Sequence, residues 1–90
     1  MIRNHLQLND QTGENLLGFL KAELNLGFTF AGFCKTELDM GNSEHAQRFK
    51  QQIAKIIETI HHFLVRLPSE EARLSIGVRC NRLERIFSVL

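Results

Sequence analysis

One short segment of the sequence has the spacing of a metal-binding pair. Glu58 and His61 stand three residues apart, and on a helix this spacing places two side chains on adjacent turns of one face. Glu-x-x-His pairs hold metal ions in carboxylate-bridged bundles, together with a second such pair and carboxylates from other helices. The sequence contains no second pair, and Glu23 is the carboxylate that an antiparallel hairpin would bring to the level of His61. A mononuclear site of Glu23, Glu58 and His61 is one hypothesis, and the simpler expectation is that Glu58 and His61 are ordinary surface residues.

No combination of residues in the chain is typical of a catalytic centre. Cys34 and Cys80 fall at apolar positions without a histidine at helical spacing, and neither a P-loop nor a Gly-x-Ser-x-Gly motif occurs. The expected helix register separates the two cysteines by roughly 12 Å, which is too far for a disulfide. The same register brings Glu37 near His45, where an ion pair or a hydrogen bond is expected. We therefore predict two reduced thiols in the core, no cofactor and no enzymatic activity.

Composition and charge argue against several classes of partner. The 90 residues carry 11 Lys and Arg against 10 Asp and Glu, for a net charge of +1, and they include neither Trp nor Tyr. Near the C-terminus, arginines alternate with glutamates, and no Trp or Tyr ring is available to stack bases, so no nucleic acid partner is expected. These arginines are Arg73, Arg79, Arg82 and Arg85. No apolar run approaches the ~20 residues of a membrane span, and the N-terminus does not form a secretory signal, so a cytoplasmic location is expected.

Three amphipathic helices must position these residues. Across residues 43–67, apolar side chains recur at steps of three and four, which is the clearest helical pattern in the chain and predicts one buried face. The residues expected on this buried face are Ala46, Phe49, Ile53, Ile56, Ile60, Phe63 and Leu67. Gly41 and Pro68 mark the two turns, because Gly favours the left-handed conformation after a helix and Pro pushes the preceding residue out of the helical region. Asn42 or Ser43 is expected to cap the second helix, and Ser69 the third.

The expected fold is all-α, an elongated up-down-up three-helix bundle. It occupies residues 12–90 as a single domain, because a chain of this length cannot enclose two cores, and residues 1–11 form an N-terminal tail. The capping residue types of Asn9, Asp10 and Thr12 predict that the first helix begins there. A break of this helix near Gly27 is an alternative, but apolar stripes that continue in phase through Gly27 favour one helix.

The first helix carries two apolar stripes, and a three-helix bundle can bury only one. The stripe expected in the core comprises Leu17, Leu20, Leu24, Phe28, Ala31, Cys34 and Leu38. The second stripe leaves Phe19, Leu26, Phe30 and Phe33 without a partner, and exposed apolar patches of this kind usually mark a contact surface. We therefore predict a homodimer in which this helix packs on its copy. The alternative is that Ile2, Leu6 and Leu8 fold back over the stripe within one chain.

Residues 31–60, AGFCKTELDMGNSEHAQRFKQQIAKIIETI, resemble the centre of a tetratricopeptide-type helical hairpin. Gly41 stands before the turn and Ala46 early in the second helix, and the sequence has no second copy at a period of 34 residues. More broadly, the chain is similar to small bacterial helical proteins that carry such a helix-turn-helix. This resemblance implies a helical hairpin and transfers no functional residue. The predicted function is a non-enzymatic module for protein–protein contact, self-association first, and the alternative is a small metal-binding bundle.

Overall fold

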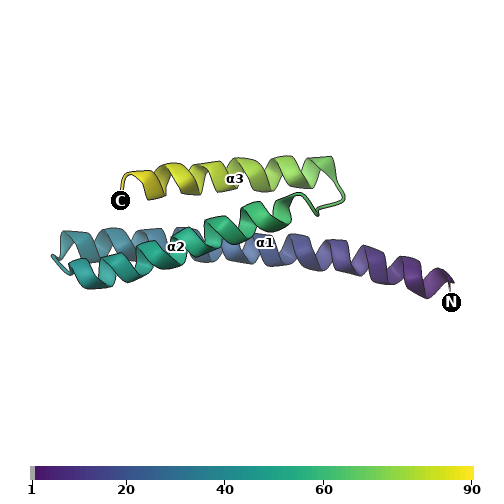
Figure 1. Cartoon of the computed structure of the whole chain (residues 1–90), viewed down its shortest axis with the longest axis horizontal. Helices are drawn as coiled ribbons and strands as arrows, with labels where there is room; N and C mark the ends of the chain where they lie inside the picture. The colour runs from purple at the N-terminus through teal and green to yellow at the C-terminus, as the bar shows by residue number, and fades with distance from the viewer. Residues whose placement is uncertain (1) are drawn as a thin grey trace.

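Three helices make up the described part of the chain. The computed structural model describes the backbone of residues 2–90 and the side chains of residues 13–90. Helix α1 spans Ile2–Asp39, α2 spans Ser43–Leu64 and α3 spans Glu70–Ser88. Helix α2 runs back along α1, and α3 runs back along α2, so the path is up-down-up (Figure 1). The predicted all-α, elongated three-helix bundle is confirmed.

Helix α1 begins earlier than its capping residues predicted. It starts at Ile2, rather than among Asn9, Asp10 and Thr12, and continues without a break through Gly27 to Asp39. Asn, Asp and Thr lower the stability of a helix interior only by a fraction of a kcal/mol each, about 0.7 at most, so their presence does not force a start. The backbone of the predicted tail is therefore helical from Ile2. The side-chain packing on which a division into tail and bundle depends lies outside the described residues.

The turn between α1 and α2 has the hydrogen bonds of a Schellman motif. Gly41 has a φ of 80°, in the left-handed region that only glycine adopts without strain. The backbone N–H of Asn42 donates to the Glu37 carbonyl at 2.8 Å, and the N–H of Gly41 donates to the Leu38 carbonyl at 3.1 Å. Asn42 occupies the N-cap position of α2, but its side chain makes no capping bond there. The role predicted for Gly41 is confirmed, and side-chain capping by Asn42 is wrong.

The second turn follows the expectation for Pro68 and Ser69. Helix α2 ends at Leu64, three residues before the predicted end, and a short loop leads to α3. The hydroxyl oxygen of Ser69 accepts a hydrogen bond from the backbone N–H of Ala72 at 3.3 Å, which confirms the predicted cap. Leu67 in this loop is 1% exposed, so the loop is anchored to the core through its side chain.

The core lies along the centre of the bundle and takes residues from all three helices. Its fully buried members are large aliphatic side chains and the two cysteines: Leu20, Leu24, Cys34, Ile53, Ile60, Leu67, Ile76, Cys80 and Leu83. Several residues that the apolar stripes place in the core, Leu17 and Phe49 among them, are less buried than predicted. Leu38 is 38% exposed near the end of α1, and Phe28 and Phe63 are half-buried. The core is therefore mainly aliphatic, and most of the aromatic rings lie at its edge.

Candidate functional site

Part of the second apolar stripe of α1 lies on the surface. Phe19, Leu26 and Phe33 are 43, 42 and 51% exposed, and we call these three residues the α1 row. Helix α3 packs on the other flank of the α1–α2 hairpin, where the Arg79 guanidinium donates to the Asn25 side-chain oxygen at 2.8 Å. Because α1 is continuous from Ile2, its first turns cannot double back along the same helix to cover the row. The side chains of Ile2 and its neighbours up to residue 12 lie outside the described residues.

Aromatic rings of α2 border the α1 row at both of its ends. The Phe63 ring meets the Phe19 ring edge to face, with centroids 6.1 Å apart. The Phe49 ring lies 5.5 Å from Phe30 and 5.6 Å from Phe33. Phe30, which the sequence grouped with the exposed residues, is half-buried and packs against the core. The exposed surface of α1 is therefore smaller than predicted, because Phe30 is partly covered. The half-buried rings of Phe49 and Phe63 on α2 extend the apolar surface beside it.

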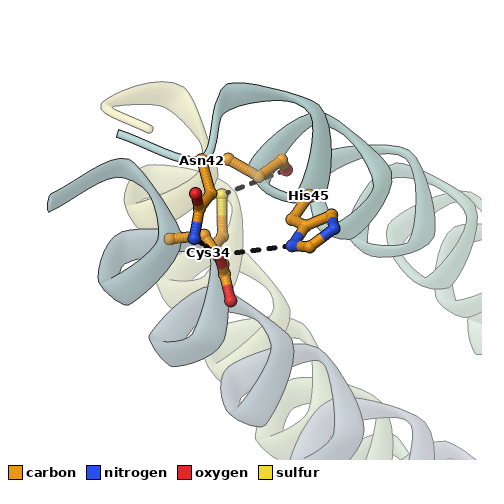
Figure 2. A network of polar contacts seen from close by, with 5 residues as sticks. Cys34, Asn42 and His45 are labelled. Carbon is orange, nitrogen blue, oxygen red and sulfur yellow. Dashed lines mark hydrogen bonds and ion pairs between the residues drawn. The ribbon is translucent and has the colours of Figure 1, made fainter. Parts of the chain in front are cut away.

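A small polar network of Glu37, Asn42 and His45 lies at the turn between α1 and α2. The Glu37 carboxylate accepts a hydrogen bond from the Asn42 amide at 2.7 Å and lies 3.5 Å from Nδ1 of His45 (Figure 2). Figure 2 also shows the Cys34 thiol, which donates to the Ala46 carbonyl at 3.4 Å. The predicted contact between Glu37 and His45 is confirmed. Because His45 is exposed and Cys34 is turned to a backbone carbonyl, the network fixes the turn and forms no nucleophile–base pair.

The structure does not assemble Glu23, Glu58 and His61 into a cluster of ligands. Glu23 is half-buried on α1 and Glu58 is exposed on α2. His61 instead contacts α3, where its Nε2 forms an ion pair or hydrogen bond with the Glu84 carboxylate. Among residues 13–90, the only set of three potential metal ligands within reach of one another is His61, Cys80 and Glu84.

Cys80 is the buried member of this set. Its thiol is directed at the Glu84 carboxylate, with 3.8 Å between the sulfur and the oxygen. Burial raises the pKa of the Cys80 thiol to about 11, and the negative charge of Glu84 and its hydrogen bond with the thiol act in the same direction. The thiol therefore stays protonated at neutral pH and is not an activated nucleophile. Both cysteines are free and buried, in agreement with the prediction.

Two of the C-terminal arginines have partners within the chain. The Arg79 guanidinium binds Asn25 of α1, as described above, and the Arg73 guanidinium donates to the backbone carbonyl of Leu67. Both are half-buried, whereas Arg82 and Arg85 are exposed. The four side chains therefore do not form one exposed row that could follow a phosphate backbone, and the absence of a nucleic acid partner stays a prediction.

Comparisons with protein-family models, with curated proteins and with solved structures find no match to this chain. The resemblance to tetratricopeptide-type hairpins and small bacterial helical proteins therefore stays a prediction. No helix in the part of the chain that the structure describes is long and apolar enough to cross a membrane.

Two features of these sites were missed at the level of sequence. Phe49 and Phe63 fit the single apolar stripe of α2, which predicts them in the core, because spacing alone does not distinguish the centre of the core from its edge. Cys80 and Glu84 lie four residues apart, so their common face on α3 was readable from the sequence. Their proximity to His61 depends on the register between α2 and α3, which the spacing within one helix does not contain.

Proposed function

We propose that this protein is a non-enzymatic self-association module, and that two copies dimerise through the α1 row. The observation that carries the proposal is the regular spacing of three exposed apolar side chains on one helix. Phe19, Leu26 and Phe33 follow one another at intervals of seven residues, which is nearly two helical turns, so they form an almost straight line of ~21 Å.

The row suits a two-fold axis. In a symmetric dimer both copies use the same patch, and each contact occurs twice. Leu26 stands midway between the two phenylalanines, so antiparallel α1 helices that cross at Leu26 would place Phe19 of one copy opposite Phe33 of the other. Leu26 would then meet its own counterpart on the axis. Phe63 and Phe49 would border these contacts at the two ends of the row, beside Phe19 and Phe33 respectively.

Burial of the row provides a favourable free energy of the size that a weak to moderate dimer requires. Full burial of a large apolar side chain is worth about 1.5–3 kcal/mol, and each residue of the row is roughly half exposed. Six such side chains across a dimer therefore contribute about 4–9 kcal/mol, with an added contribution from the rings of α2. Together with the contacts of the α2 rings, this contribution is expected to exceed the cost of association, which is at least about 4 kcal/mol, so we expect a dimer at tens of micromolar.

Sedimentation equilibrium on the purified chain tests the proposal. The expected mass is near twice the 10.4 kDa of one chain, and a mass of one chain at tens of micromolar would reject the dimer. Phe33→Glu places a charge at the most exposed end of the row and should give a folded monomer. Val78→Glu, at a 61% exposed position of α3, is the matched control and should remain dimeric. Equal dissociation of both variants would contradict an interface on α1.

A pair of charge variants tests the two-fold axis itself. Leu26→Glu and Leu26→Lys should each be monomeric, because each places two like charges opposite one another on the axis. Mixed in equal amounts, the two variants should form a heterodimer, since the charges are then opposite. No recovery of dimer in the mixture, with both variants folded by circular dichroism, would place Leu26 away from the axis.

A further inference from the structure

A second cluster of polar side chains lies between α2 and α3, apart from the α1 row. It consists of Nε2 of His61 on α2 with Sγ of Cys80 and a carboxylate oxygen of Glu84 on α3. These three atoms lie within 4.8 Å of one another. The carboxylate of Glu84 is the common partner, because it contacts the imidazole of His61 and accepts from the thiol of Cys80.

The three atoms are arranged as ligands of one small cation would be. Zinc binds sulfur at about 2.3 Å and nitrogen or carboxylate oxygen at about 2.0–2.2 Å, and tetrahedral geometry then separates the ligand atoms by roughly 3.3–3.7 Å. Cys80 and Glu84 already lie at 3.8 Å, and His61 approaches from the facing helix. Small side-chain rotations are therefore enough to form the complete set, with no movement of the helices.

We propose that His61, Cys80 and Glu84 form a binding site for a single zinc ion, with a fourth position open to solvent. The mixed set of nitrogen, sulfur and oxygen disfavours magnesium and calcium, which prefer oxygen ligands alone, and suits zinc, which binds thiolate, imidazole and carboxylate ligands. On zinc binding, the thiol of Cys80 releases its proton to solvent, and the resulting thiolate sulfur coordinates the zinc ion. The open position follows from the exposure of the His61 side chain, at 55%, beside the buried sulfur.

The chain offers matched controls, a second histidine and a second buried thiol, that lie outside the proposed zinc site. His62 follows His61 directly, but its ring packs edge to face against Phe63, with centroids 4.8 Å apart. Cys34 is the other buried thiol, and its sulfur donates to the Ala46 carbonyl. A proposal that depended on any histidine or any buried thiol would not distinguish these residues from His61 and Cys80.

Cobalt titration gives a direct readout, because cobalt bound by a thiolate shows a charge-transfer band in the near ultraviolet. The whole chain should bind one equivalent, and zinc should displace the cobalt and bleach the band. Cys80→Ser should abolish the band, and Cys34→Ser should keep it. His61→Gln and Glu84→Gln should weaken zinc binding at least about tenfold in calorimetry, as expected for loss of a ligand, while His62→Gln should bind as the parent does.

Several outcomes would overturn the zinc site. They are the absence of a charge-transfer band in the parent chain, a band that survives Cys80→Ser, and equal affinities of the His61→Gln and His62→Gln variants. Circular dichroism of each variant confirms folding, and if Cys80→Ser does not fold, His61→Gln and Glu84→Gln decide the question at solvent-accessible positions. The site does not depend on dimerisation, so sedimentation of the same samples shows whether one proposal fails without the other.

Discussion

The two sides of α2 border the same core but differ in chemistry. Toward α1, the edge of the core is aromatic, with Phe49 and Phe63 against the exposed rings of the α1 row. Toward α3, the edge is polar, with His61 facing Glu84 above the buried Cys80. Between the two edges, Ile53 and Ile60 are fully buried. The aliphatic centre therefore accounts for the fold, and the two edges present different chemistry on the two sides of α2.

The largest difference between a variant and its matched control should come from Gly27, where α1 meets both of its neighbours. A Cβ at Gly27 would lie 2.6 Å from Cδ2 of Leu83 on α3 and 3.4 Å from Cγ2 of Ile56 on α2. Leu83 is fully buried, so its methyl group has little room to yield. Gly27→Ala should therefore overpack the core, which costs typically about 1–3 kcal/mol.

Gly77→Ala is the control for this prediction. Both glycines are inside helices, and both variants gain the same ~1 kcal/mol of helix propensity, but nothing lies within 4 Å of a Cβ at Gly77. Denaturant unfolding should show the Gly77 variant more stable than the Gly27 variant by about 1–3 kcal/mol. Equal stabilities of the two variants would mean that α1 does not pack closely against Leu83 and Ile56 at Gly27.

Much of this architecture was predictable from the sequence, because local signals suffice for it. The single apolar stripe of residues 43–67, the positive φ of Gly41 and the cap at Ser69 each depend on residues close together in the chain. The start of α1 was not predictable in this way, since Asn9, Asp10 and Thr12 are compatible with both a cap and a helix interior.

The candidate sites were less predictable, because they depend on contacts between helices. The spacing of Glu58 and His61 correctly describes one helix, but it does not show that His61 of α2 contacts Glu84 of α3. In the same way, the stripe of α1 correctly predicted that Phe19, Leu26 and Phe33 lie on the surface, and was wrong for Phe30. The contact between Phe30 and Phe49, which leaves Phe30 half-buried, could not be predicted in this way, because it depends on how α2 packs against α1.

The aromatic edge can be tested by Phe63→Ala. As a core residue, Phe63 would cost about 3–5 kcal/mol when truncated to Ala. In the structure it is half-buried, with its ring against Phe19 and the Arg66 guanidinium 5.2 Å from its centroid. We therefore expect a loss of about 1–2 kcal/mol in denaturant unfolding, in proportion to the area it buries. A loss of 3 kcal/mol or more would make this ring part of the central core.

The smallest effect should come from the polar edge, in the variant His61→Gln without metal. His61 and Glu84 are 55 and 37% exposed in their side chains, and an ion pair at such positions contributes at most about 1 kcal/mol because water competes for both groups. The unfolding free energy of the metal-free variant should therefore fall by less than about 1 kcal/mol, which is less than the loss for Phe63→Ala.

Added zinc should separate the two edges further. It should raise the unfolding free energy of the parent chain and of Phe63→Ala, and leave that of His61→Gln nearly unchanged. If zinc stabilised His61→Gln as much as the parent, the polar edge would be only a surface ion pair, and the difference between the two sides of α2 would have no consequence for metal binding.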